Sequence, residues 1–240
     1  MEIDYLRQLE IFNPSDFGNR SVTVVGTGAT GSFVTFLLAQ IGIKNIDVYD
    51  FDKVEEHNLP NQIFSIKHIG MPKVEALKEV IKEKCGFDIK IHNEMVTDQI
   101  KNPGTYFFLL TDTMASRREI FEKCIKGRAF NTDLVIETRM DADCGRVYAF
   151  NPNSPNQVKE WQSTLYPDKE ATTSLCGASI SIAPTVTFLA SLAIWKLIHH
   201  FDVAHGPNHT KKKGKEEQLY NETTFQLGPE EITSRRFNLL

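Results

Sequence analysis

The sequence has few cysteines, no cysteine pair at metal-binding spacing and no excess of basic charge. Its four cysteines, Cys85, Cys124, Cys144 and Cys176, lie far apart in 240 residues. This spacing argues against a disulfide scaffold and against a structural zinc site, so we expect free thiols in a reducing cytosol. The 27 basic and 31 acidic residues give a formal charge of −4. No overall basic field therefore favours nucleic acid or anionic lipid as a partner.

The sequence also shows no sign of a signal peptide or of a clear membrane span. The N-terminus carries charged residues where a signal peptide would have an uninterrupted apolar stretch. Residues 178–198 form the one long apolar stretch, but Pro184 and several serine and threonine residues interrupt it. We interpret this stretch as a buried helix rather than a membrane span. A cytoplasmic protein without membrane contact is therefore expected.

Length and composition are those of an ordinary globular protein. Hydrophobic residues make up 41% of the chain and charged residues 24%, which excludes collagen-like and disordered classes. A chain of 240 residues is long enough for one sizeable core. We therefore expect a single domain that covers residues 1–240.

Strand-like and helix-like segments alternate along the first part of the chain. Residues 21–26 are a β-branched run that ends in glycine, residues 29–41 read as an apolar helix, and residues 45–50 read as a second strand. Together they form a β-α-β unit, which implies a parallel sheet. Residues 53–70 show no clear period and are interpreted as a functional loop.

The alternation continues further along the chain. Helices are predicted at 74–84, 114–125, 157–164 and about 178–200, and strands at 87–92, 106–112, 134–139 and 146–150, with an edge strand or hairpin within 218–240. The predicted fold is a Rossmann-like α/β domain with a mainly parallel sheet flanked by helices. Its C-terminal extension is expected to be mixed or antiparallel.

A glycine triplet follows the first predicted strand. Gly26-x-Gly28-x-x-Gly31 lies at the turn from strand to helix, where backbone N–H groups and a helix N-terminus can approach a phosphate closely. Asp50 lies 19 residues beyond Gly31, at the end of the second predicted strand, where an acid accepts hydrogen bonds from ribose hydroxyls. Glycines alone also serve close helix–strand packing. With the acid in register, the pattern predicts a nucleotide site.

The residues after Asp50 favour one kind of nucleotide-binding protein over the dehydrogenases that the glycine triplet first indicates. Residues 50–62 read Asp-Phe-Asp-Lys-Val-Glu-Glu-His-Asn-Leu-Pro-Asn-Gln, and residues 70–73 read Gly-Met-Pro-Lys. This pattern resembles the ThiF/MoeB family, relatives of the ubiquitin-activating enzymes. In that family Asp-x-Asp, Asn-Leu-x-Arg-Gln and Gly-x-Pro-Lys follow one another in this order.

The resemblance extends over most of the chain. Residues 5–8 resemble the family's N-terminal Tyr-x-Arg-Gln, and Thr111-Asp112 with Arg117 resembles its Thr-Asp-Asn-x-x-x-Arg. Cys176 lies eight residues before Pro184, as a family cysteine lies before the proline that begins the last long helix. The motifs thus occur in the family order from the N-terminal region to the last predicted helix.

The resemblance implies an ATP-dependent adenylyltransferase. In this reaction a carboxylate, typically the C-terminal glycine of a ubiquitin-like or sulfur-carrier protein, attacks the α-phosphate of ATP and expels pyrophosphate. Charge develops on phosphate oxygens, so fixed cations and a magnesium ion should stabilise it. We assign Arg7 and Lys73 as the cations and Asp112, at the carboxyl end of a predicted strand, as the magnesium ligand.

Further nucleotide contacts are expected from the same segments. Besides Lys73 and the three glycines, the residues assigned to the nucleotide are Asp50, Asp52, Asn58, Asn61 and Gln62. The family also implies a homodimer in which Arg7 reaches the ATP site of the neighbouring subunit. No nucleic-acid partner is expected.

Two positions depart from the family pattern. Asn61 lies where the family has the arginine of Asn-Leu-x-Arg-Gln, so a cation expected near the leaving phosphates is absent. Thr113 replaces the asparagine of Thr-Asp-Asn. The departure at Asn61 keeps a noncatalytic scaffold, which binds a carrier protein or a partner subunit, as an alternative.

Cys176 has two interpretations. In some relatives a cysteine at this position forms a persulfide or thioester with the activated carrier, and the start of a helix favours a thiolate. We therefore include Cys176 among the catalytic candidates, with a small packing residue as the alternative. Two other functions also stay open: adenylation of a small molecule, a peptide or a tRNA base, and an NAD-binding Rossmann enzyme. The acidic chain disfavours tRNA.

Overall fold

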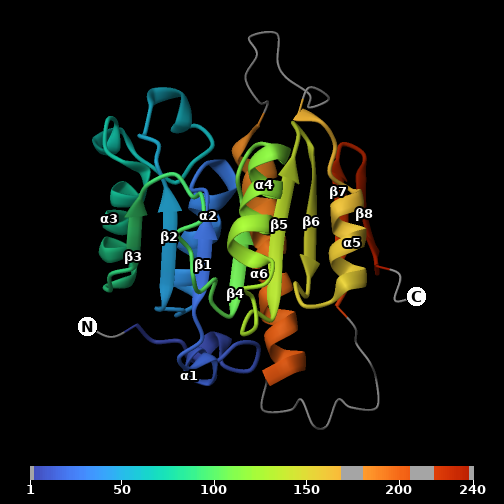
Figure 1. Ribbon diagram of the computed structural model, residues 1–240. Coiled ribbons are helices and arrows are strands. Elements are labelled where there is room, and N and C mark those ends of the chain that lie inside the picture. The colour runs from blue at the N-terminus through green and yellow to red at the C-terminus, as the bar shows by residue number, and fades with distance from the viewer. Residues whose placement is uncertain (1–2, 169–180, 206–218, 238–240) are drawn as a thin grey trace.

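A computed structural model describes residues 3–168, 181–205 and 219–237, which form one layered α/β structure around an eight-stranded sheet (Figure 1). The strand order is β3-β2-β1-β4-β5-β6-β7-β8. Strands β3 to β5 in this order are parallel, and β6, β7 and β8 continue the sheet as antiparallel neighbours. The sheet therefore has the predicted Rossmann-like parallel part and the predicted antiparallel C-terminal extension.

The element bounds follow the chain order. The strands are β1 (Val22–Val25), β2 (Ile46–Asp50), β3 (Lys90–Asn93), β4 (Tyr106–Leu109), β5 (Leu134–Met140), β6 (Cys144–Phe150), β7 (Glu222–Leu227) and β8 (Glu230–Arg235). The α-helices are α1 (Pro14–Phe17), α2 (Ala29–Gln40), α3 (Lys73–Cys85), α4 (Met114–Ile120), α5 (Pro155–Ser163) and α6 (Ala183–His205). Shorter turns are the 3-10 helices η1 (Leu6–Gln8), η2 (Glu56–Asn58) and η3 (Ile66–His68) and the π-helical turn η4 (Phe121–Ile125).

Local sequence explains where the main helices begin and end. Helix α2 begins directly after Gly28, and its apolar residues pack both on the sheet and on α6, so it is apolar on more than one side. Pro72 precedes the first residue of α3, and Gly86 ends that helix in a left-handed conformation with φ of 79°. Ser154 caps α5 by accepting a hydrogen bond from the backbone N–H of Gln157.

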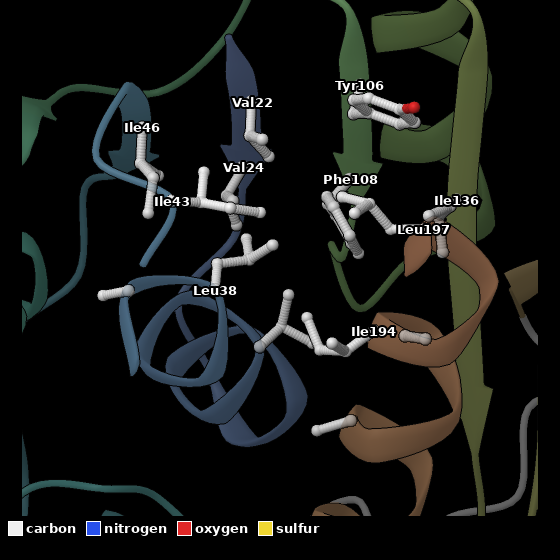
Figure 2. Packing of buried hydrophobic residues seen from close by; sticks show 14 of the residues in the cluster. Val22, Val24, Leu38, Ile43, Ile46, Tyr106, Phe108, Ile136, Ile194 and Leu197 are labelled. Carbon is white, nitrogen blue, oxygen red and sulfur yellow. The ribbon is translucent and has the colours of Figure 1, made fainter. Parts of the chain in front are cut away.

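Each face of the sheet has its own apolar core. Helices α2, α3 and α6 cover one face, and α4 and α5 cover the other (Figure 1). On the first face, Val24 of β1 and Phe108 of β4 lie against Leu38 of α2 and Ile194 of α6 (Figure 2). On the second face, aromatic residues of η4, β6 and α5 form a smaller cluster around Trp161. Burial on both faces accounts for the continuous apolar strands of the parallel part.

Most predicted elements occur, with shifted bounds. The strand predicted at 87–92 begins at Lys90, and the helix predicted at 114–125 changes to a π-helical turn at Phe121. Residues 53–70, which are interpreted as a loop, contain no α-helix or strand and include two single 3-10 turns, η2 and η3. The predicted hairpin near the C-terminus is confirmed by β7 and β8.

Helix α6 accounts for the long apolar stretch. It has the length and apolar composition of a membrane-spanning helix, but it packs along the sheet and against α2. Leu189, Ala193 and Leu197 are completely buried in this packing. The interpretation as a helix packed in the protein is therefore confirmed for residues 183–200, and the helix continues to His205.

Two histidines, His200 and His205, lie in the C-terminal part of α6, next to the start of β4. His200 Nδ1 lies 3.3 Å from the hydroxyl oxygen of Tyr106, and His205 Nε2 lies 2.6 Å from a carboxylate oxygen of Asp133. Burial is the main cause that lowers the pKa of His200 from 6.5 to about 4. Asp133 opposes this shift, and the neighbouring histidines add to it. His200 is therefore neutral in the folded protein near neutral pH.

We expect mild acid to destabilise the fold through His200. The unfolded chain binds more protons than the folded protein between pH 6.5 and about 4, so the free energy of unfolding falls as the pH is lowered through this window. His200→Gln should remove the part of this loss of unfolding free energy that comes from His200, up to about 3 kcal/mol. Denaturant unfolding across this pH range measures the free energy of unfolding, with the exposed His57→Gln as the control. A wild-type pH profile in His200→Gln would contradict the assignment.

Candidate functional site

The candidate site lies at the carboxyl ends of β2, β1 and β4. The chain runs outward from β1 to β2 and β3 on one side and from β4 to β5 on the other, so the strand order reverses between β1 and β4. Ligands of open α/β sheets bind in the crevice at such a reversal. Neighbouring strands are about 5 Å apart, so the ends of β2 and β4 lie roughly 10 Å from each other across β1. A nucleotide phosphate chain fits this span.

The glycine triplet forms the turn from β1 to α2, and the structure gives a different reason for glycine at each of the three positions. Gly26 has φ of 95°, and a Cβ there would lie 2.6 Å from the carbonyl oxygen of Leu110. A Cβ on Gly31 would lie 1.9 Å from the carbonyl oxygen of Gly26. A Cβ on Gly28 would meet no atom within 4 Å, so this position opens outward at the N-terminus of α2. Two glycines are thus required by packing, and one faces the space where a phosphate could approach.

Asp50 supports the glycine turn from inside. Its Oδ2 accepts hydrogen bonds from the backbone N–H and the hydroxyl of Thr27, at 2.6 and 2.9 Å, and its Oδ1 accepts one from the backbone N–H of Asp52 at 2.8 Å. The residue is 9% exposed. These contacts assign Asp50 a supporting role that the sequence did not indicate. Its predicted contact with a ribose stays a prediction.

The loop between β2 and α3 closes on itself and brings Lys73 to the end of β2. Backbone hydrogen bonds join Val54 with Met71 and Gly70, and Lys73 N–H donates to the carbonyl of Asp52 at 2.9 Å. Lys73 Nζ donates to Asp52 Oδ2 at 2.9 Å; the lysine side chain is 8% exposed, whereas that of Asp52 is 49% exposed. The ammonium group is therefore held at the site edge by a partner that solvent and ligands can reach.

Three polar residues of this loop were also predicted to contact the nucleotide. Asn58 is buried, and its Oδ1 accepts a hydrogen bond from the backbone N–H of Glu55 at 2.9 Å. Asn61 Nδ2 donates to the hydroxyl of Ser181, the residue that begins the described approach to α6. Asn61 Oδ1 and Gln62 Oε1 are buried without a hydrogen-bond partner in the described part of the chain. The loop thus holds unused acceptors next to the site.

Asp112 lies beyond the end of β4 with an exposed carboxylate. No hydrogen bond to this carboxylate occurs among the described residues, whereas its backbone carbonyl lies 3.4 Å from NH1 of Arg117. Arg117 is buried, its Nε lies 2.9 Å from Glu137 Oε1, and its NH2 donates to the carbonyl of Thr138 at 3.0 Å. The backbone of Asp112 is therefore supported while its carboxylate stays available. A free carboxylate beside a phosphate site fits a magnesium ion, which takes few protein ligands besides phosphate oxygens and water.

Glu137 is a central residue of the site that sequence reasoning missed. Its carboxylate is completely buried and accepts hydrogen bonds from Arg139 at 2.9 to 3.1 Å and from the indole N–H of Trp161 at 3.1 Å. Together with Arg117 these residues form a buried ionic network at the end of β5. The signal in the sequence was an acid inside an otherwise apolar strand, two residues before an arginine, because a buried charge needs a partner.

Of the predicted catalytic residues, Arg7 does not join this group, and Cys176 cannot be placed. Arg7 lies on η1, where the neighbouring Gln8 donates to the carbonyl of Ile41 at 2.8 Å, beyond the C-terminal end of α2. The glycine turn is at the other end of that helix, roughly 18 Å away for 12 residues. Arg7 is exposed and cannot reach the site of its own chain. Cys176 lies outside the described residues.

The other three cysteines have the surroundings of packing residues. Cys85 and Cys124 are buried, and Cys144 begins β6. Burial raises the pKa of each of these thiols. A raised thiol pKa reduces the thiolate fraction at neutral pH, so these three thiols are poor nucleophiles.

The chain is similar to proteins of one known family. The family model described as "ThiF family" matches residues 7–235. A "Ubiquitin-like modifier-activating enzyme 5" from Caenorhabditis briggsae is 34% identical over 80 residues, which are 33% of this chain and 18% of that protein. An "Adenylyltransferase and sulfurtransferase MOCS3" from Aedes aegypti is 30% identical over 153 residues, which are 58% of this chain and 35% of that protein. The matched parts span about a third or less of these two relatives.

A solved structure shows the same fold over nearly the whole chain. The crystal structure of E. coli MccB with ATP has a TM-score of 0.67 and 18% sequence identity, and the match covers 94% of this chain and 65% of that chain. At this identity the likeness concerns the fold. It supports the sheet order and the helix layers described above.

The glycine turn gives a stability prediction with a matched control. Gly31→Ala should destabilise the fold by roughly 1–3 kcal/mol or more, because the added Cβ would force α2 away from the carbonyl of Gly26. Gly28→Ala should cost much less, since nothing lies within 4 Å of the added atom and φ is −69°. Denaturant unfolding of both variants measures the difference. Equal stability of the two variants would show that the turn is not packed as described.

Proposed function

Because the chain belongs to the ThiF family, we propose that it uses ATP to adenylate a carboxylate, namely the C-terminal glycine of a ubiquitin-like or sulfur-carrier protein. One observation carries the proposal. Three neighbouring strand ends bring together an outward-facing glycine turn, the Lys73–Asp52 pair and the free carboxylate of Asp112. These groups suit the binding of a metal-complexed triphosphate.

The proposed reaction is a substitution at the α-phosphorus of ATP. An oxygen of the substrate carboxylate forms a bond to this phosphorus, the bond to the bridging oxygen of the β-phosphate breaks, and pyrophosphate leaves. Negative charge grows on the phosphate oxygens, so the main task of the protein is to orient the phosphates and to offset that charge. Backbone N–H groups at the start of α2 and the ammonium group of Lys73 are the groups of this chain suited to it.

Asp112 is the residue that we propose to hold magnesium. Its carboxylate is exposed and has no partner among the described residues, which suits a hard cation that also binds phosphate oxygens. When bound, the ion would supply positive charge near the reacting phosphates. The hydrogen bonds of Asp50 and Arg117 keep the two flanking turns in place.

Asn61 favours a second candidate function. The neutral amide of Asn61 bonds to Ser181, in a loop where the resemblance predicts an arginine. A protein of this family that binds a carrier or partner subunit without adenylating it would tolerate such a change. ATP binding without any exchange of pyrophosphate into ATP would support this scaffold. Binding of NADH instead of ATP would favour an NAD enzyme.

We further propose that the active form is a homodimer and that Arg7 serves the site of the partner. The position of η1 at the far end of α2 supports this proposal, because an arginine there cannot contact phosphates bound to its own chain. An exposed N-terminal turn is free to cross an interface. Cys176 is proposed as the thiol that attacks the acyl carbon of the adenylated carrier, so that a thioester forms and AMP leaves.

The phosphate and metal assignments give a direct test. Lys73→Ala and Asp112→Ala should each lower carrier-dependent ATP–pyrophosphate exchange by at least about a hundredfold, because both remove charge stabilisation in the transition state. Lys78→Ala and Asp98→Ala are matched controls, since both side chains are exposed and lie outside the site. Exchange rates and thermal unfolding are measured together. Folded variants that exchange at the wild-type rate would refute the assignment.

Complementation between two inactive chains tests the role of Arg7. Arg7→Ala and Asp112→Ala should each be inactive alone. A mixed dimer of the two contains one site with both residues intact and one site that lacks both. Random equal mixing makes about half of the dimers mixed, so about a quarter of the wild-type activity should return after co-expression. No recovery in verified mixed dimers would mean that Arg7 does not act across the interface.

A further inference from the structure

Asp168 contacts the first turn of α4 from a distant part of the sequence. Its Oδ1 accepts a hydrogen bond from the backbone N–H of Met114 at 2.5 Å, and its Oδ2 accepts one from that of Ala115 at 3.3 Å. These two N–H groups follow Asp112 by only two and three residues. The carboxylate of Asp168 therefore fixes the backbone directly beyond the proposed magnesium ligand.

This contact is additional to the ordinary cap of α4. The side chain of Thr113 already accepts a hydrogen bond from the backbone N–H of Ser116 at 3.1 Å and so caps the helix locally. A helix of seven residues is thus capped both by its own N-cap residue and by an acid 54 residues further along the chain. The second contact restrains where the turn lies, and not only whether it is helical.

The other side of the same turn is held by the buried ionic network. Arg117 approaches the carbonyl of Asp112 and pairs with Glu137, which binds Arg139. Arg139 in turn donates to the backbone carbonyl and the hydroxyl of Thr164, at 2.6 and 2.9 Å. Thr164 is only four residues before Asp168. The contacts therefore close a ring that returns to the turn from which it started.

We propose that Asp168 is a positioning residue for the magnesium site at Asp112. This inference rests on the proposed function. A metal ligand must be held within a few tenths of an ångström of its productive geometry by the groups around it. The Asp112 carboxylate has no side-chain partner in the described part of the chain, so its position depends on the backbone that Asp168 and Arg117 restrain. Asp168 acts through this backbone and does not bind the metal.

Asp168 could influence a bound cation in two ways, through its negative charge or through its hydrogen bonds, and substitutions that remove only the charge distinguish them. A purely electrostatic effect would depend on its negative charge, whereas positioning depends on its hydrogen bond to Met114. Asn at position 168 keeps an acceptor oxygen and loses the charge, and Ala loses both. The side chain of Asp168 is itself exposed, so neither change opens a cavity in the core, and only Asp168→Ala leaves the backbone N–H of Met114 without this acceptor.

The test measures metal-dependent ATP binding without turnover. Titration calorimetry of wild type, Asp168→Ala and Asp168→Asn with ATP at increasing Mg²⁺ gives the Mg²⁺ concentration for half-maximal binding. We expect this concentration to rise about tenfold in Asp168→Ala, within the range seen for lost supporting contacts of metal sites. Asp168→Asn should stay within about twofold of wild type. ATP binding in EDTA should be the same in all three.

Ser154→Ala is the matched control, because it removes the cap of α5 and touches no part of the α4 turn. It should lower the melting temperature and leave the Mg²⁺ dependence unchanged. An unchanged Mg²⁺ concentration for half-maximal ATP binding in Asp168→Ala would overturn the inference. An equal rise of this concentration in Ser154→Ala would also overturn it, and so would a rise in Asp168→Asn as large as that in Asp168→Ala. If wild type itself shows no Mg²⁺-dependent ATP binding, the proposed function fails and the inference fails with it.

Discussion

The buried carboxylate of Glu137 carries the ionic contacts on which the site end of the sheet depends. It lies between the guanidinium groups of Arg117 and Arg139 and also accepts a hydrogen bond from the indole N–H of Trp161. An arginine left unpaired inside a protein costs several kcal/mol, so neither arginine would keep its place without this acid. Because Arg117 reaches the end of β4 and Arg139 reaches the end of α5, one carboxylate fixes these two elements against β5.

Burial divides the acids of the site into two kinds. Asp50 and Glu137 are buried, and their oxygens accept hydrogen bonds from the surrounding chain, so they shape the turns after β1 and β4. Asp52 and Asp112 are exposed, beyond the ends of β2 and β4, and can meet ligands. A ligand group on an exposed turn is only as well placed as the buried groups beneath it. The buried acids therefore give the exposed acids their geometry.

Local patterns in the sequence predicted the fold and much of the site, but not the contacts between distant segments. The glycine triplet, the strand endings and the apolar periods each depend on a few neighbouring residues, so the parallel sheet, its antiparallel extension and the position of Asp112 could be predicted. The π-helical turn after α4 could not, because its pattern of apolar residues is that of an ordinary helix. Asp168 gave no local signal, since its partner is 54 residues away.

The balance of charged side chains at the strand ends favours a source of positive charge outside the chain. Two basic side chains at these strand ends are already paired, Lys73 with Asp52 and Arg117 with Glu137, and Asn61 adds no charge. A triphosphate would therefore meet the carboxylate of Asp112, which has no cationic partner among the described residues. A magnesium ion at Asp112 would offset only part of this repulsion. A cation from a second copy of the chain, as proposed for Arg7, would offset more of this negative charge.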